Sequence, residues 1–202
     1  MIFFTADLHL GHANSIRYNN RPFDNLEEMN EAIINRFNSK VKPNHSLYIL
    51  GDVFWGKSAE ANTILRRLNG KKFLIKGNHD VKFLTDPDFD HTIFEWVQDI
   101  AYLKHKKKMF VLCHYPMLEW LGYYRGYIHL YGHLHNRYVR GEEKYNESRL
   151  AVLGGNAINV GVDVNDFSPV LADDIIDRVT AASAVTGNNC PGSSELAGEY
   201  PE

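Results

Sequence analysis

The first eighty residues alternate short apolar runs with segments of helical periodicity, and this order constrains the fold more than any other feature. The apolar runs cover residues 1–7, 46–52 and 71–80. Residues 58–70 between the last two are amphipathic and end at a glycine. The longer segment between the first two has apolar residues at helical spacing, namely Leu26, Met29, Ile33, Ile34 and Phe37. A strand–helix–strand–helix–strand order favours parallel pairing, so we expect an α/β fold.

The rest of the chain adds further strands and a polar C-terminal segment. Residues 99–116 are predicted to form a hairpin with KHKKK as its turn, residues 127–135 another strand, and residues 150–164 one or two more. After about residue 180 the composition is rich in Ala, Ser, Gly, Asn and Glu and buries little apolar surface. We therefore predict one domain over residues 1–178 and a flexible, low-complexity tail over residues 179–202.

Composition narrows the class of protein. The net charge of −3 gives no general attraction to nucleic acid or to an anionic membrane. No apolar run approaches the roughly 20 residues of a membrane span, and no basic segment precedes the apolar N-terminus, so neither a membrane segment nor a signal peptide is predicted. Two cysteines exclude a disulfide framework and favour a cytoplasmic location.

Nearly every predicted strand ends in side chains that can bind a metal ion. In an α/β fold the carboxyl ends of the strands share one edge of the sheet, so these segments should converge there. Residues two apart on an extended strand point to the same side, so each D-x-H or H-x-H pair can chelate one centre. A single polar residue at a strand end is more often a turn or capping residue, but five such segments together are not explained that way. The donors are Asp7, His9, Asp52, Asn78, His79, Asp80, His114, His133 and His135.

This set of donors indicates two metal ions. Imidazole, carboxylate and amide donors suit Mn²⁺, Fe, Zn²⁺ or Ni²⁺, and the lack of thiolates argues against a structural zinc site. The donors are too many for one ion and fit two ions that share a bridging carboxylate, which is typical of phosphoester hydrolysis. Mn²⁺ is the first expectation, with Mg²⁺ as a further alternative.

The same segments resemble the signature of the calcineurin-like metallophosphoesterase superfamily, in particular that of its small bacterial and phage-type members. The signature D-x-H, G-D, G-N-H-D/E, H and G-H-x-H stands here as DLH, GD, GNHD, CH and GHLH between residues 7 and 135. The trailing NVGVD, residues 159–163, is similar to the end of such domains. The resemblance implies a four-layer αββα sandwich, two mixed β-sheets flanked by helices, with a dinuclear metal site at the sheet edge.

The resemblance also implies a role for each donor. His79 would be the imidazole beside the substrate, and Asp80 would orient it. Water between two divalent cations is acidic enough to be hydroxide near neutral pH and to attack phosphorus, while His79 protonates the leaving group. The implied ligands are Asp7, His9, Asp52 and His135 for one ion and Asn78, His114 and His133 for the other, with Asp52 as the bridge.

Five residues outside the shared donor set are candidate substrate contacts. His12 is expected to reach the site as an outer donor. Arg21 is expected to bind a distal phosphate, although an ordinary surface charge is an equal alternative. Trp55, Tyr123 and Tyr124 are candidates for stacking on a nucleobase, or else for a small core that holds the loops.

The expected function is hydrolysis of phosphodiesters in nucleotide or nucleic-acid-like substrates. A phosphomonoesterase or a nucleotide pyrophosphohydrolase is the enzymatic alternative, since a His after the Asn occurs in both kinds of enzyme. A non-catalytic interaction scaffold on the same fold is a remote alternative, because such scaffolds are expected to lose ligands or the catalytic histidine. The sequence leaves the physiological substrate, the metal and the oligomeric state open.

Overall fold

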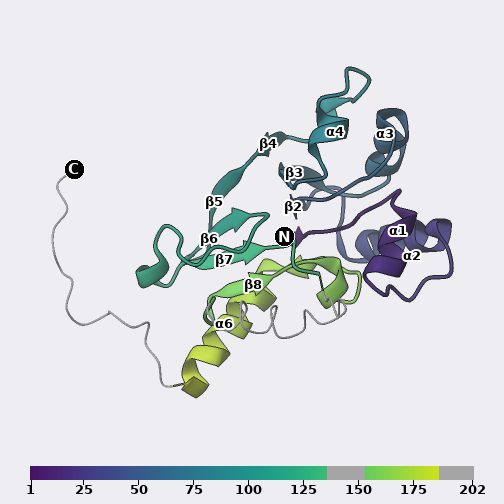
Figure 1. Ribbon diagram of the computed structural model, residues 1–202. Helices are drawn as coiled ribbons and strands as arrows, with labels where there is room; N and C mark the ends of the chain where they lie inside the picture. Colours follow the sequence, from purple (N-terminus) through teal and green to yellow (C-terminus); the bar gives the residue numbers. More distant parts are fainter. Residues whose placement is uncertain (136–152, 187–202) are drawn as a thin grey trace.

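The computed structural model describes residues 1–135 and 153–186, which form two mixed β-sheets flanked by helices (Figure 1). The five-stranded sheet has the order β4-β3-β2-β1-β9. Strands β1 to β4 are parallel, and β9 pairs antiparallel with β1. These strands are β1 (Ile2–Thr5), β2 (Ser46–Leu50), β3 (Lys71–Ile75), β4 (Trp96–Gln98) and β9 (Val170–Leu171).

The four-stranded sheet has the order β5-β6-β7-β8. Strands β5 and β6 form an antiparallel hairpin, and β6, β7 and β8 are parallel. Only Asp99 separates β4 from β5, so the chain passes from one sheet directly into the other. The four strands are β5 (Ile100–His105), β6 (Lys108–Cys113), β7 (Ile128–Tyr131) and β8 (Ala157–Asn159).

The helices lie mainly between the strands of the first sheet. The α-helices are α1 (Ala13–Tyr18), α2 (Leu26–Lys40), α3 (Ser58–Arg66), α4 (Val81–Leu84) and α6 (Ala172–Thr186), and the 3₁₀ turns are η1 (His91–Ile93), η2 (Tyr123–Arg125) and η3 (Val162–Val164). Helix α2 begins after Asn25, whose side chain accepts a hydrogen bond from the Glu28 N–H at 2.9 Å. This cap satisfies one of the backbone donors that the first helical turn leaves unpaired.

Strand β2 shows how one sheet separates two hydrophobic cores. Its alternate residues Leu47 and Ile49 pack with residues of α2 and α3, whereas Tyr48 and Leu50 pack against the second sheet. Helix α6 closes the core between the sheets with Ile175 and other apolar residues. Because both faces of β2 are covered, its sequence is apolar almost throughout.

The predicted α/β fold is confirmed, with β1, β2 and β3 in parallel register and two mixed sheets flanked by helices. The predicted hairpin also forms, but its turn is narrower than KHKKK, because His105 and Lys108 still pair as strand residues. Strand β4 was not predicted. It is only three residues long and depends on β3 for its pairing, so it leaves little periodic signal in the sequence.

Helix α6 continues to Thr186, past the predicted domain boundary at residue 178. Val179 is buried and continues the apolar face begun by Ile175, and the alanines of this segment are strong helix formers. Residues 187–202 of the predicted tail lie outside the described residues. No helix in the described part of the chain is both long and apolar enough to cross a bilayer.

Candidate metal centre

The predicted metal donors lie on loops that follow the carboxyl ends of β1, β2, β3, β6 and β7. The loops after β1 and β2 remain hydrogen-bonded beyond the strands. The Asp7 N–H donates to the Gly51 carbonyl at 3.0 Å, and the His9 N–H donates to the Asp52 carbonyl at 2.9 Å. These bonds hold the first two signature segments side by side.

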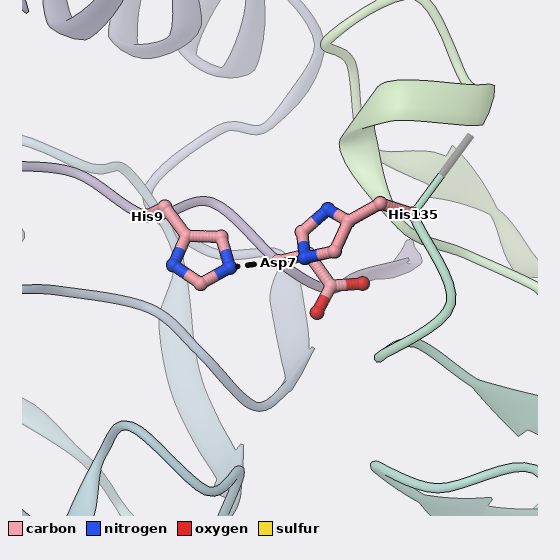
Figure 2. A group of neighbouring side chains, drawn as sticks. All are labelled: Asp7, His9 and His135. Carbon is pink, nitrogen blue, oxygen red and sulfur yellow. Dashed lines mark hydrogen bonds between the residues drawn. The ribbon is translucent and has the colours of Figure 1, made fainter. Parts of the chain in front are cut away.

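Asp7, His9 and His135 form a first cluster, in which one ligand atom of each lies within 4.8 Å of the others (Figure 2). The Nε2 atoms of His9 and His135 are 3.2 Å apart. Both oxygens of the Asp7 carboxylate accept from the His133 N–H, at 3.0 and 2.9 Å. The cluster therefore joins the first strand of one sheet to the loop after β7 in the other.

Asp52, His114 and His133 form a second cluster with the same spacing of ligand atoms. His114 is fully buried, and its Nδ1 lies 2.7 Å from the Leu50 carbonyl. Because a carbonyl can only accept, Nδ1 carries the proton and Nε2 presents a lone pair. The Asn78 Oδ1 lies 3.1 Å from this Nε2, so the amide faces the same point.

Asp52 belongs to the second cluster, but its carboxylate also faces the first cluster. Its Oδ2 is 3.7 Å from Nε2 of His9 in the first cluster and 3.6 Å from Nε2 of His114 in the second. Its Oδ1 accepts from the His79 N–H at 2.9 Å, which fixes the orientation of the carboxylate. Asp52 thus has the geometry of a bridging ligand.

Four of the donors have left-handed backbone conformations, which are uncommon outside glycine. The φ angles are 58° at Asp7, 49° at His9, 54° at Asp52 and 66° at His133. Each such conformation costs on the order of 1–3 kcal/mol and persists only where the surrounding structure imposes it. The turns that aim these side chains at the clusters therefore hold backbone strain.

The donor chemistry fits divalent cations. Nε2 of His114 and Oδ1 of Asn78 are both acceptors, and two acceptors 3.1 Å apart repel each other unless they share a cation.

Glycines allow the close packing around the carboxylates. A side chain on Gly77 would overlap Oδ1 of Asp52, and one on Gly132 would come within 2.7 Å of Oδ2 of Asp7.

Burial favours the ligand forms of the imidazoles. It lowers the pKa of His133 to about 4 and holds the pKa of His9 well below its usual range, so both rings are neutral near pH 7. Burial also raises the pKa of Asp7 to about 6, although the nearby histidines oppose this rise. A carboxylate that is poorly solvated in this way is stabilised by an adjacent cation.

His79 lies at the border between the second cluster and the solvent. Its Nε2 is 3.8 Å from Oδ2 of Asp52, and its side chain is 37% exposed. The ring packs edge-on against Trp55 at 5.1 Å and against His9 at 5.5 Å between centroids. His79 can therefore contact both a bound group at the clusters and a molecule in the adjacent cleft.

Asp80 does not have the position that the resemblance implies. Its carboxylate is fully buried and accepts from the N–H groups of Gly77 at 2.8 Å and of Asp52 and Val53 at 2.9 Å, rather than from the His79 ring. Burial raises the pKa of Asp80 to about 6, although these three donors oppose the rise. Asp80 therefore holds the backbone of Asp52 and of its neighbour Val53 in place.

A cleft of about 400 Å³ adjoins His79 and is bordered by His12 and Trp55. The rings of His12 and Trp55 are stacked, with centroids 4.8 Å apart and an interplanar angle of 18°. Trp55 is 40% exposed. Tyr18 lies on the same cleft and was not predicted there, because α1 is too short to show a helical pattern. The structure thus brings two of the five predicted substrate contacts to the site.

Arg21 lies inside the protein, where it is 5% exposed, and not on the surface that the phosphate-binding prediction requires. Its guanidinium donates to both carboxylate oxygens of Asp163 at 2.8 and 2.9 Å. Asp163 in turn accepts from Nδ1 of His135 at 2.7 Å. Burial alone would raise the pKa of Asp163, but the hydrogen bond from His135 and the charge of Arg21 outweigh it and lower the pKa.

Tyr123 and Tyr124 line a separate pocket of about 300 Å³ together with Trp120 and Tyr127, and they are not among the residues that line the cleft beside His79. The Trp120 indole N–H donates to the Tyr127 carbonyl at 3.0 Å. Trp120 is buried, whereas Tyr124 is 59% exposed, so Trp120 rather than Tyr124 packs within this loop.

Two residues next to the clusters were missed in the sequence. The ring of Tyr115 packs edge-on against His133 at 4.8 Å and against His114 at 4.9 Å, and its position directly after the CH motif was the available signal. Asp163 belongs to the NVGVD segment, whose resemblance was noted without a role. Its contact with His135 bridges 28 residues and leaves no local pattern.

The chain is similar to known proteins in sequence. The calcineurin-like phosphoesterase family model matches residues 1–110, more than half of the chain. An uncharacterised protein of Methanocaldococcus jannaschii is 30% identical over 186 residues, covering 91% of this chain and 94% of that protein. The gene 66 protein of Mycobacterium phage L5 is 33% identical over 81 residues, 39% of each chain.

A protein of unknown function from Aquifex aeolicus, known from a crystal structure, is similar in fold. Its TM-score is 0.65 at 26% identity, and the match covers 88% of this chain and 98% of that one. The described part of this chain has the two mixed sheets and the two clusters of candidate metal ligands. The chain belongs to the calcineurin-like phosphoesterase family and is a metal-dependent phosphoester hydrolase.

Proposed function

We propose that the protein hydrolyses phosphodiester bonds in nucleotide or nucleic-acid-like substrates with two divalent cations, Mn²⁺ in the first instance. The position of Asp52 carries this proposal. Its Oδ2 lies 3.6–3.8 Å from Nε2 of His9, His79 and His114, between the two clusters. A carboxylate so placed can serve two ions at once.

The ligands follow from the two clusters. When bound, two such cations acidify water and offset the charge that develops on the phosphoryl oxygens. Three of the proposed ligands, Asp52, His114 and His135, are oriented by a hydrogen bond from their second polar atom to a backbone group or to Asp163. The proposed ligands are Asp7, His9, Asp52 and His135 for one ion and Asp52, Asn78, His114 and His133 for the other.

His79 is the proposed proton donor to the leaving group. Its Nε2 faces Asp52, and its ring also borders the cleft. Trp55 and His9 pack against the ring and limit its rotation. A protonated imidazole held there can donate from Nε2 to an alkoxide oxygen as the bond to phosphorus breaks.

The cleft supports a phosphodiester over a monoester. A diester carries a second organic substituent, and the cleft of about 400 Å³ beside His79 offers a place for it. The exposed indole of Trp55, stacked on His12, provides an aromatic surface that suits a nucleobase. The nucleoside substituent of the diester would therefore occupy the cleft.

The test compares three substrates in chelator-treated and Mn²⁺-loaded protein. We expect no turnover without metal, recovery with Mn²⁺, and a higher kcat/KM for thymidine 5′-p-nitrophenyl phosphate than for bis-p-nitrophenyl phosphate or p-nitrophenyl phosphate. Trp55→Ala should raise KM for the nucleoside diester, whereas Tyr124→Ala in the separate pocket should not. Full activity after chelation would contradict the metal chemistry, and a preference for the monoester would favour the phosphomonoesterase alternative.

A further inference from the structure

The two clusters are braced by different buried charged groups. Asp80 holds the backbone around Asp52 and Gly77 and so supports the second cluster and the bridge. On the opposite side, the guanidinium of Arg21 and the carboxylate of Asp163 form a buried ion pair, with side chains 0% and 4% exposed. Neither member of this pair is among the proposed metal ligands.

Arg21 holds the loop that carries the first signature segment. Its Nη2 donates to the Asp7 carbonyl at 2.7 Å, and its Nη1 donates to the Leu8 carbonyl at 2.9 Å. Asp7 has a positive φ angle, so these two bonds support a turn that the backbone alone does not favour. Through them, Arg21 holds the two consecutive carbonyls between Asp7 and His9.

Asp163 connects Arg21 to His135 by hydrogen bonds. Its Oδ2 accepts from Nδ1 of His135 at 2.7 Å and from Nη2 of Arg21 at 2.9 Å, while its Oδ1 accepts from Nε of Arg21 at 2.8 Å. A carboxylate cannot donate, so Nδ1 of His135 carries the proton and Nε2 is left as the free ligand atom. The guanidinium of Arg21 is thereby linked to the backbone of Asp7 and, through Asp163, to the ring of His135.

In the second cluster, the ring of His114 is anchored by an uncharged group. Nδ1 of His114 meets a neutral carbonyl, that of Leu50, at 2.7 Å. An imidazole that donates to a carboxylate is more basic and more firmly oriented than one that donates to a carbonyl. The two positions are therefore chemically unequal, although their ligand types are similar.

We propose that Arg21 and Asp163 are positioning residues for one metal position alone, that of Asp7, His9 and His135, and that the two positions consequently bind metal with unequal affinity. This inference rests on the proposed dinuclear site. The ion pair joins residues 142 apart in the sequence. The metal position of Asp7, His9 and His135 thus depends on the contact of Arg21 and the loop after β1 with Asp163 in η3.

The test measures Mn²⁺ binding by calorimetry and by electron paramagnetic resonance. Wild-type protein should bind two equivalents of unequal affinity. In Asp163→Asn the affinity of one equivalent should fall about 10- to 100-fold while the other is unchanged. At an Mn²⁺ concentration that just fills both positions of the wild type, the coupled two-ion spectrum of the wild type should give way in the variant to that of isolated Mn²⁺. Arg21→Lys keeps the positive charge but not the forked geometry of the guanidinium. It should also lower the Mn²⁺ affinity of the same single equivalent.

Asp166→Asn is the matched control. Asp166 is three residues from Asp163 and pairs with Arg36 at 3.5 Å, but its side chain is 91% exposed. It has a φ angle of 51°, which asparagine tolerates, so this variant should bind both equivalents as the wild type does. Adding Asp163→Asn to His135→Ala should cause no further loss, because the effect passes through His135.

Three outcomes would overturn the inference: Asp163→Asn with two equivalents at wild-type affinity, an equal loss at both positions with an unchanged melting temperature, or additive losses with His135→Ala. Should neither Asp163→Asn nor Arg21→Lys fold, the wild type still decides, since two equal affinities contradict the proposal. A wild type that binds fewer than two equivalents would instead contradict the dinuclear site of the proposed function.

Discussion

The two oxygens of Asp52 have different partners, and this division explains how one side chain can serve both clusters. Oδ1 is held by the His79 N–H, so the carboxylate cannot rotate freely. Oδ2 is left to face the imidazoles of both clusters. At the scale of single residues, Asp52, His114 and His135 each have one polar atom held by a hydrogen bond and the other directed at the clusters.

His79→Ala should separate catalysis from metal binding. Since His79 is proposed to donate a proton and not to bind metal, the variant should keep two equivalents of Mn²⁺ and lose about 10²- to 10⁴-fold in kcat. Elemental analysis and diester hydrolysis measure the two quantities. His91→Ala, which removes an exposed histidine on η1, is the control. Loss of metal from His79→Ala would make His79 a ligand.

Asp80→Asn should destabilise the protein. An amide has one acceptor oxygen, so its NH₂ group would face at least one of the N–H groups of Gly77, Asp52 and Val53. We expect a loss of about 1–3 kcal/mol in the free energy of unfolding, measured in urea. Asp88→Asn changes an exposed carboxylate and should stay within about 0.5 kcal/mol. Equal stabilities would exclude this role of Asp80.

His129 should make stability depend on pH. It is fully buried, its Nδ1 lies 3.1 Å from the Val111 carbonyl, and its Nε2 accepts from the Met117 N–H at 3.2 Å. Burial lowers its pKa in the folded state, so the unfolded chain takes up the proton first as the pH falls below about 6.5. The folded state is therefore stabilised above that pH and loses stability below it.

His129→Gln removes this titration while keeping a donor and an acceptor. The stability of the wild type minus that of the variant should fall by up to about 1.4 kcal/mol per pH unit below pH 6.5. Urea unfolding at pH 5.5, 6.5 and 7.5 measures it, and titrations elsewhere cancel in the difference. A constant difference would show that His129 does not titrate in this range.

At the scale of elements, the strands were predictable and some of their side-chain contacts were not. Apolar runs and helical spacing predicted β1, α2, β2, α3 and β3, because each signal is local in the sequence. The structure also brings the predicted donors into two clusters, and their ligand roles remain predictions. The partners of Arg21 and Asp80 could not be predicted, since Arg21 meets Asp163 across 142 residues and Asp80 meets backbone N–H groups.

Helix α2 should depend on its first turn. Asn25 caps the helix by accepting from the Glu28 N–H, and Glu28 accepts in return from the Asp24 N–H at 2.8 Å. Asn25→Ala should cost about 1 kcal/mol in urea unfolding. Asn35→Ala, an exposed position inside the same helix, should be neutral or slightly stabilising because alanine is the better helix former. Similar effects of both variants would contradict the cap.

At the scale of the whole molecule, the metal centre joins the two sheets. Asp7 and Asp52 follow strands of the five-stranded sheet, whereas His114, His133 and His135 follow strands of the four-stranded sheet. Cations bound by such donors stabilise the folded state, because the unfolded chain does not bring them together. Metal bound at the candidate site would therefore also hold the two sheets together.

Metal removal should lower the melting temperature. At a free Mn²⁺ concentration about 100 times Kd, binding contributes about 2.7 kcal/mol. For a chain of this size that corresponds to roughly 5–10 °C. Differential scanning calorimetry with Mn²⁺ and with chelator measures the shift. An unchanged melting temperature, with binding confirmed separately, would mean that the unfolded chain binds the metal equally well.

Arg21 and Asp163 are far apart in the sequence, so the ribosome makes them at different times. Asp163, the partner of His135, follows Asp7 by 156 residues in the sequence. At about 5–20 residues per second, the ribosome completes that interval in roughly 8–30 s. During this time the growing chain contains Asp7 and His9 but not Asp163, which orients His135 in the folded protein. The first metal position is thus completed only after the residues of β1 to β4 of the five-stranded sheet have been made.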